Sequence, residues 1–479
     1  MKSRIWLYLI VAGLLPGISA PAVAQEPLHL SLEEAVDIAL KNNLGLRSTR
    51  LGVQIQEQGV EVENARFGRA LDLSLSRQSN RSPSFSSLER VETLTSTTLS
   101  TDLGLAQQLT TGGRLGLRFS NRRNASNAAF NLIDPIYSSG LNLSFTQPLL
   151  QGRGRISRIG VDLARVGVEQ SQVQNEGRAR TLRAEVGRAY WNLLFARENL
   201  QVKEQFREGA RRVLETVKVR AEMGMDSRSS ILQAEVEVAR REEEVVTAEG
   251  AAAQAEDVLK SLLNLEQHSG LLGLTVVPEL SPFAGDLSQG ITQTLSRDPD
   301  YHQLQLELKN IELQLVLARD QARPSVSLNA TAGLSGLGGS YGDDLKVLKD
   351  LDARSWQGSL ALQVPLGKSP ADQRLGQRRL EKERRTVDLE HLRQQLEQQV
   401  RQRFRQAGID RRRAEVAQLA EGLAGRNVAE EEERLKLGLS TARLVLDAQD
   451  DLAQARASRL RAVVDYNQSL IEWQRLTGE

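Results

Sequence analysis

Apolar residues recur along this chain with two different periods, which predict two kinds of secondary structure. Over most of the sequence they follow steps of three and four, as at Val445, Ala448 and Leu452, and such steps place them on one side of a helix. In six shorter segments leucine alternates with small or polar residues, as at Leu71 and Leu73, which is the period of a strand. The chain is therefore predicted to be mainly helical, with a smaller set of strands.

The helical segments predict paired rods. A capping box at Ser31 and Glu34 starts the first helix, because the hydroxyl and the carboxylate each satisfy a free backbone N–H. At 1.5 Å per residue, the two longest helices would each extend roughly 100 Å. Two shorter helices placed end to end match one long helix, so the pattern predicts a closed set of antiparallel rods. The predicted helices cover about residues 31–66, 155–222, 228–265, 291–322, 371–437 and 442–476.

The six alternating segments each have one apolar face and one small or polar face. Their length and period are typical of strands that cross an outer membrane, although a soluble sheet packed on one side has the same local pattern. The N-terminal residues have the pattern of an export signal, described below, and the chain has no other apolar core, so membrane strands are favoured. Six strands are too few for one chain to close a channel alone. The predicted strands are about residues 69–79, 97–108, 113–121, 139–149, 325–335 and 356–366.

The sequence also contains an internal duplication. Aligning Gly224 with Gly438 pairs Arg220 with Arg434, and each glycine interrupts a long helical pattern. Each interruption is interpreted as the tip of a helical hairpin. One hairpin tip is expected in each half of the chain.

These patterns divide the chain into two tandem repeats. Residues 25–265 form the first repeat, with a tip near 220–230, and residues 291–479 form the second, with a tip near 434–444. Residues 266–290 are interpreted as a connector. The first repeat has a longer strand region, which predicts one added β-hairpin. The sequence leaves open whether residues 97–121 add strands to the membrane-spanning sheet.

The first 24 residues have the pattern of a secretory signal peptide. Lys2 and Arg4 precede an apolar run that ends at Pro16, and small residues before Gln25 form a cleavage site. A membrane anchor is the alternative, but the run is shorter than the roughly 20 residues that a spanning helix needs. We therefore expect residues 1–24 to be removed from an exported protein.

Composition gives few indications of chemistry. The chain has no cysteine and a formal charge of +1, so neither a disulfide framework nor a basic surface for nucleic acid is expected. Its four histidines are scattered, and no nucleophile or phosphate-binding motif occurs. We expect no enzyme activity, no cofactor and no bound metal.

With these features the sequence resembles the TolC-like outer membrane factor family, the outer membrane efflux proteins. The resemblance covers nearly the whole mature chain and is carried by "LSLEEAVDIALKNNLGLR" at 30–47, "FTQPLLQGRG" at 145–154 and the paired tips. It implies a homotrimer in which an outer membrane β-barrel continues as a long periplasmic α-helical coiled-coil barrel, with two tandem repeats per chain. The family usually contributes four strands per subunit.

The resemblance also implies two sites. Duplicated tips in this family dock on a periplasmic adaptor that serves an inner membrane transporter, and acidic residues after the second tip constrict the channel entrance. Asp447 matches one acidic position, whereas Leu444 occupies the other, which puts a double acidic ring in doubt. The implied gate residues are Asp447, Asp450 and Asp451, and the implied docking residues are Arg220, Gly224, Met225, Arg434, Gly438 and Leu439.

The function expected from this resemblance is an exit duct in the outer membrane of a Gram-negative bacterium, as part of a tripartite efflux or type I secretion system. The alternative is a periplasmic coiled-coil adaptor or scaffold without a pore. An adaptor would need one hairpin and no membrane strands. The sequence does not distinguish drug, metal ion or polypeptide as cargo, nor does it identify the transporter.

Overall fold

A computed structural model describes residues 28–84, 91–129, 131–224, 227–265, 270–275, 280–367 and 369–478. The predicted signal peptide and Met225 lie outside the described residues. The chain is mostly helical and divides into two compact units, each drawing segments from both halves of the sequence. The first unit includes residues 186–279 and 416–464, and the second includes residues 43–185, 280–415 and 465–479.

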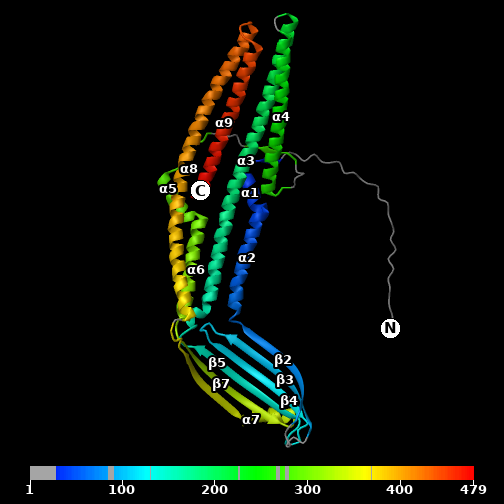
Figure 1. The fold of residues 1–479 in the computed structure, drawn as a ribbon, viewed down its shortest axis with the longest axis vertical. Coiled ribbons are helices and arrows are strands. Elements are labelled where there is room, and N and C mark those ends of the chain that lie inside the picture. The colour runs from blue at the N-terminus through cyan, green and yellow to red at the C-terminus, as the bar shows by residue number, and fades with distance from the viewer. Residues whose placement is uncertain are drawn as a thin grey trace, which may run out of the picture. The chain divides into compact units, whose positions relative to one another are not determined.

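Two helical hairpins form the main part of the first unit. One joins α3 (Ile159–Glu222) to α4 (Arg228–Leu263), and the other joins α8 (Pro370–Lys436) to α9 (Ala442–Thr477); within each hairpin the helices run side by side (Figure 1). Their buried residues recur at steps of three, four and seven, as in a coiled coil. The core between the hairpins comprises Phe206, Val213, Val217, Val428, Leu435, Val445, Ala448, Leu452 and Ala453.

In the first unit, an ionic cluster joins α3, α4 and the segment at Leu272. Glu256 on α4 accepts from Lys260 Nζ at 2.9 Å and from Arg197 Nη2 at 2.6 Å. Its other contact is the backbone N–H of Leu272, in β6 (Leu272–Leu274), which pairs in parallel with β1 (Leu28–Leu30). Short helix α1 (Leu32–Asn42) starts at the predicted capping box.

A six-stranded antiparallel sheet belongs to the second unit, with strand order β2-β3-β4-β5-β7-β8 (Figure 1). The two β-hairpins from the first half of the chain and the one β-hairpin from the second half therefore lie in one sheet. Residues 97–121, which the sequence analysis discussed as an added hairpin, belong to β3, β4 and the turn between them in this sheet. The strands are β2 (Arg69–Pro83), β3 (Thr93–Gln108), β4 (Arg114–Ser126), β5 (Ile136–Pro148), β7 (Ser325–Gly338) and β8 (Arg354–Gln363).

The register brings the apolar positions of all six strands onto one face. Leu73 is opposite Leu103, which is opposite Phe119, and the row continues through Leu141 and Leu334. Many of these side chains are exposed, and Leu71 on the same face keeps 72% of its surface accessible. The opposite face carries serine, threonine, asparagine and glutamine. Except where α7 packs on it, the described residues leave this apolar face uncovered, and edge strands β2 and β8 each pair on one side only.

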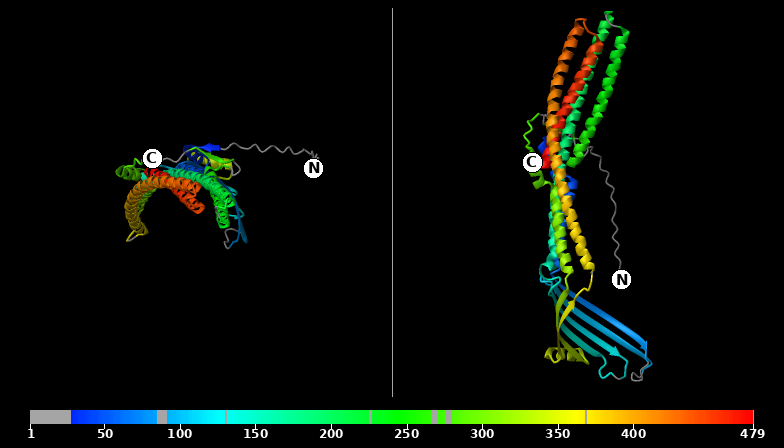
Figure 2. Two further views of the ribbon diagram at one scale, coloured as in Figure 1. Left: turned by 90° about the horizontal axis from the view of Figure 1, so that it is seen from above. Right: turned by 60° about the vertical axis from the view of Figure 1, so that its left-hand side comes forward.

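Helix α7 (Tyr341–Asp350) follows β7 and lies at one end of the sheet (Figure 2). It is fixed by the fully buried carboxylate of Asp344, which accepts from the backbone N–H and hydroxyl of Ser139 and from Asn121 Nδ2 at 3.2 Å. Gly336 and Gly338 leave room for this helix, since a Cβ on either would meet its backbone. The sequence analysis predicted no helix between its strands at 325–335 and 356–366, and α7 lies in that interval.

Two of the predicted helices are each broken in two. The first breaks at Asn43, whose extended backbone and side chain cap α2 (Leu44–Ala65). The second breaks at Asp298, which caps α6 (Pro299–Gln321) after α5 (Leu287–Arg297). Proline at the first position of α6 disfavours helical backbone at the residue before it, so the chain changes direction there.

No helix among the described residues is both long enough and apolar enough to cross a bilayer.

Candidate functional site at the hairpin tips

Both hairpins turn at a glycine with left-handed backbone. Gly224 has φ of +78° and Gly438 has φ of +73°, a region that costs other residues about 1–2 kcal/mol. After Gly438, Leu439 N–H donates to the carbonyl of Arg434 at 2.8 Å, which closes the end of α8. The alignment of the two glycines thus corresponds to the same backbone reversal at both tips.

The arginines of the two tips have different partners. Arg220 donates from Nη1 to the carbonyl oxygen of Leu435 at 3.1 Å, so it connects α3 with the end of α8. Arg434 pairs with Glu431 at 3.0 Å on its own helix. The other carboxylate oxygen of Glu431 accepts from the Ser440 hydroxyl at 2.6 Å, which holds the second turn.

Apolar side chains stand exposed beside both turning points. Met223 keeps 65% of its surface accessible, Leu437 73% and Leu439 68%. The sequence analysis selected Leu439 but not Met223 and Leu437, although these two align with each other in the duplication. Exposed apolar groups at the end of a polar hairpin form a surface that a partner protein can cover.

The three acidic gate candidates do not face the same side. Asp447 is exposed and has a weak contact with Arg443 at 3.8 Å, and Asp451 is exposed one turn further along α9. Asp450 points toward α4, where Arg240 Nη2 contacts Oδ2 at 2.6 Å and Arg241 contacts Oδ1. Asp447 and Asp451 therefore share one exposed face, and Asp450 holds the two hairpins together.

Around Asp450 lies an ionic cluster that sequence reasoning did not find. The side chain of Arg241 is only 4% exposed, and its Nε donates to Glu237 at 2.8 Å. Glu244 accepts from Lys203 on α3 at 2.8 Å, which extends the cluster to a third helix. Three cations and three carboxylates balance: Arg240, Arg241 and Lys203 against Glu237, Glu244 and Asp450. Adjacent arginines in a glutamate-rich helix were the available signal, but the sequence gives no indication of which helix they would face.

Two pKa values reflect this cluster. A hydrogen bond to Glu237 raises the pKa of Arg240 further above its usual range. Burial by itself raises the pKa of Glu244, but the hydrogen bond and charge of Lys203, together with Arg241 and Arg240, outweigh it and leave that pKa lowered. Arg240 and Glu244 are therefore expected to be charged at neutral pH.

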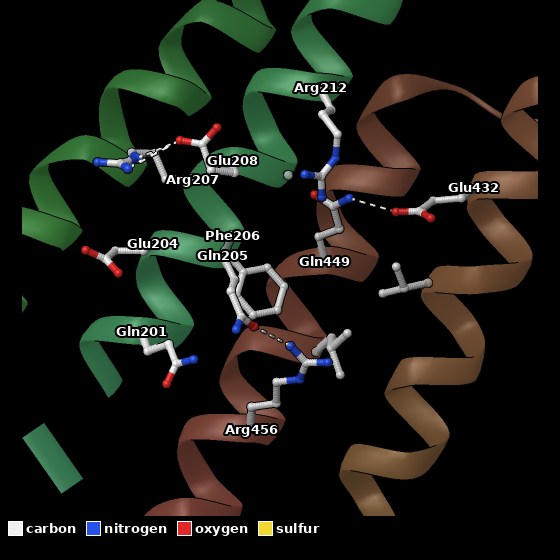
Figure 3. A pocket seen from close by; sticks show the side chains of 13 residues that line it. Gln201, Glu204, Gln205, Phe206, Arg207, Glu208, Arg212, Glu432, Gln449 and Arg456 are labelled. Carbon is white, nitrogen blue, oxygen red and sulfur yellow. Dashed lines mark hydrogen bonds and ion pairs between the residues drawn. The ribbon is translucent and has the colours of Figure 1, made fainter. Parts of the chain in front are cut away.

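A polar groove of about 710 Å³ lies between α3, α8 and α9 (Figure 3). Gln449 donates to Glu432 at 3.0 Å across it, and Arg456 donates to Gln205 at 3.3 Å. Phe206 forms its apolar floor, with the Arg456 guanidinium 5.6 Å from the ring centre. Neutral amides, ion pairs and one aromatic ring make this a seam between helices and not a site with reactive groups.

Among the described residues no group of three or more acidic, histidine or cysteine side chains is arranged to hold a metal ion.

The sequence profile of the outer membrane efflux protein family matches residues 114–265 and 290–479, which together make up more than half of the chain. The two matched ranges fall in the two repeats. The chain therefore belongs to the outer membrane efflux protein family. A search of curated proteins gave no significant match.

Solved structures share this fold at low sequence identity. A membrane protein from Pseudomonas aeruginosa is 18% identical with a TM-score of 0.69, and the match covers 93% of this chain and 90% of that one. The outer membrane protein VceC from Vibrio cholerae is 14% identical with a TM-score of 0.68, covering 93% and 96%. The CmeC outer membrane channel of Campylobacter jejuni is 16% identical with a TM-score of 0.67, covering 93% and 85%.

Proposed function

We propose that this protein is the outer membrane exit duct of a tripartite efflux or type I secretion system in a Gram-negative bacterium. The observation that carries the proposal is the open six-stranded sheet, with an exposed leucine-rich face and two unpaired edges. Unpaired backbone groups cannot remain in a bilayer, because no water is there to satisfy them. Three copies joined edge to edge, β8 to β2, would pair every edge strand.

Such a homotrimer would close a barrel of eighteen strands, since each chain supplies six. Barrels of about this size enclose an aqueous channel. The polar face, with residues such as Ser74, Asn142 and Gln357, would line the water, and Leu73 and its row would contact lipid. The helical hairpins would then extend into the periplasm.

The tips are proposed to dock on a periplasmic adaptor that belongs to an inner membrane transporter. Arg220, Gly224, Met225, Arg434, Gly438 and Leu439 remain the candidate docking residues, to which the exposure of Met223 and Leu437 adds two more. Covering these apolar groups gives a partner hairpin a favourable contact.

Asp447 and Asp451 are proposed to form acidic rings at the periplasmic entrance, because threefold copies of an exposed acid favour cations there. Asp450 is proposed to act differently, as the residue that holds the second hairpin against α4. The arrangement defines a generic duct, and the transporter would select the cargo.

The alternative function, a periplasmic adaptor or scaffold, does not use the sheet. Leucines exposed along six strands would be a liability for a soluble scaffold, because an uncovered apolar sheet with free edges aggregates.

Two neighbouring substitutions on β2 test the proposal. Leu73→Arg places a charge on the apolar face and is expected to cost about 2–4 kcal/mol in the bilayer, so that little trimer reaches the outer membrane. Ser74→Arg places the same charge on the polar face and is expected to assemble normally. Fractionation of cells followed by electrophoresis of unheated samples measures both. Equal assembly of the two variants would refute the assignment of the faces.

A further inference from the structure

Within the six strands, the charged residues on the apolar face of the sheet are all arginines. Asp344 of α7 also reaches this face, but its carboxylate is buried against Ser139 and Asn121. Arg69 lies at the end where the helices join the sheet. The other four lie toward the loop end and are called the arginine rim: Arg77, Arg81, Arg123 and Arg354.

On β2 and β4 the arginine rim begins where the leucines end, whereas Arg354, the first residue of β8, is opposite Leu334 in the row of Leu73. Along β2 the apolar face reads Leu71, Leu73 and Leu75 before Arg77 and then Arg81. Along β4 it reads Leu115, Leu117 and Phe119 before Asn121 and then Arg123.

One cross-strand row contains two of the rim arginines. Arg77 is opposite Leu99, Leu99 is opposite Arg123, and Arg123 is opposite Tyr137. The row ends at Gly338, where α7 covers the sheet. Arg77 and Arg123 thus border the apolar band from β2 to β4.

One rim arginine is held in place by its neighbour. Arg123 Nε donates to the Tyr137 hydroxyl at 3.1 Å, and the guanidinium lies 5.9 Å from the centre of that ring. Arg77, Arg81 and Arg354 are exposed. The rim therefore presents guanidinium groups beside an apolar surface.

The polar face of the same sheet differs in its charge. There Arg114, Arg118 and Arg122 on β4 share the face with Asp72 and Asp102. Among the strand residues, the polar face therefore carries both signs of charge and the apolar face carries arginine alone. Arginines that served only to centre the sheet in a bilayer would be expected at both ends, but the helix end has Arg69 alone.

We propose that the arginine rim binds the phosphate groups of phosphorylated glycolipid headgroups in the outer leaflet of the membrane. This inference rests on the proposed function, because it requires the leucine band to lie in lipid and the loop end to face outward. Guanidinium groups bind phosphate through two parallel hydrogen bonds, and their attraction to an anionic surface adds to this. A lipid fits because its acyl chains would cover the leucines while its phosphates reach the rim.

The test compares two triple variants that lose the same charge from opposite faces. Arg77→Gln/Arg123→Gln/Arg354→Gln removes rim arginines, and Arg114→Gln/Arg118→Gln/Arg122→Gln removes polar-face arginines. Each full-length trimer is reconstituted in phosphatidylcholine nanodiscs that contain fluorescent diphosphoryl lipid A, and the apparent Kd for this lipid is measured. The same lipid without phosphates serves as the second probe.

The rim variant is expected to bind diphosphoryl lipid A about fivefold more weakly for each arginine removed, and the polar-face variant is expected to bind as the unaltered protein does. A third variant, Arg77→Gln/Arg81→Gln/Arg354→Gln, leaves the contact between Arg123 and Tyr137 intact and is expected to show the same loss. Equal loss in rim and polar-face variants, or equal binding of the lipid without phosphates, would overturn the inference.

Conductance in a planar bilayer separates this inference from the proposed function. A trimer that inserts and conducts ions but shows no preference for phosphorylated lipid would overturn the arginine rim alone. A protein that neither inserts nor conducts would overturn the proposed function as well.

Discussion

Arg240 on α4 and Asp450 on α9 join the two helical hairpins, with Nη2 and Oδ2 2.6 Å apart. Asp450 also contacts Arg241, whose side chain is nearly buried. Asp450→Asn keeps the shape and removes the charge, so that Arg241 loses one of its carboxylate partners. We expect this variant to weaken the contact between the hairpins by about 2 kcal/mol.

In a planar bilayer, the Asp450→Asn channel is expected to open more often or to a higher conductance than the unaltered channel. Glu243→Gln removes an exposed charge from α4 outside the cluster and serves as the control, with little change expected in opening. If Asp450→Asn and Glu243→Gln conduct alike, the ionic cluster does not hold the entrance closed.

Exposed leucines at the second tip predict a docking surface. Leu437→Ser/Leu439→Ser removes apolar groups that contact little within the chain, so the melting temperature should stay nearly constant. Crosslinking to the cognate adaptor and efflux in cells should both fall strongly. Leu444→Ser, half-exposed on α9 beyond the turn, is the control and is expected to retain crosslinking. Normal efflux by the double variant would exclude this surface as the docking site.

The left-handed backbone at Gly438 predicts a local cost for any side chain there. Gly438→Ala is expected to destabilise the turn by about 1 kcal/mol, which hydrogen exchange of the amides at 434–441 would detect. Gly250→Ala, in the middle of α4 with open space around it, is expected to have the opposite sign because alanine favours helix. Unchanged exchange at the tip after Gly438→Ala would contradict the assigned turn.

The cap of α6 predicts a pH-dependent stability. Burial raises the pKa of Asp298 above its unfolded value, although the hydrogen bond from Tyr301 N–H at 2.9 Å opposes this shift. For an acid with a raised folded pKa, the stability contribution is present below the unfolded pKa, near 3.9, and is lost as pH rises through the folded value. Asp298→Asn retains an acceptor for Tyr301 and removes the buried charge.

We therefore expect Asp298→Asn to melt at the same or a higher temperature than the unaltered protein at pH 7. The difference should disappear in acid, where the aspartate is protonated in both states. Thermal unfolding followed by circular dichroism from about pH 3 to pH 8 measures this trend. A variant that is clearly less stable at pH 7 would show that the ionised carboxylate, and not its acceptor oxygen, is what the cap requires.

Periodicity predicted the helices and strands because each period follows from which side of an element is buried. Leu71 and Leu73 alternate with polar residues since they occupy one face of β2, and Gly224 and Gly438 mark the tips since only glycine adopts that backbone without cost. The breaks at Asn43 and Asp298 were missed, because a capping residue inside an amphipathic pattern changes only one position in it.

Contacts between distant segments could not be predicted from the sequence. Asp450 and Asp451 are adjacent and chemically identical, and only the packing of α9 against α4 separates their environments. Helix α7 was not predicted, because its short apolar pattern becomes a helix only when the buried carboxylate of Asp344 reaches Ser139 and Asn121 on the sheet. Pair interactions of this kind require the fold to be known.

The central claim is that three copies of this chain enclose a water-filled path through the outer membrane. The most direct measurement extracts the protein from membranes with detergent, determines its mass in solution and records its conductance in a planar lipid bilayer. The account predicts a trimer that dissociates on heating and forms ion-conducting pores. A monomer that stays soluble without detergent and leaves the bilayer insulating would contradict it.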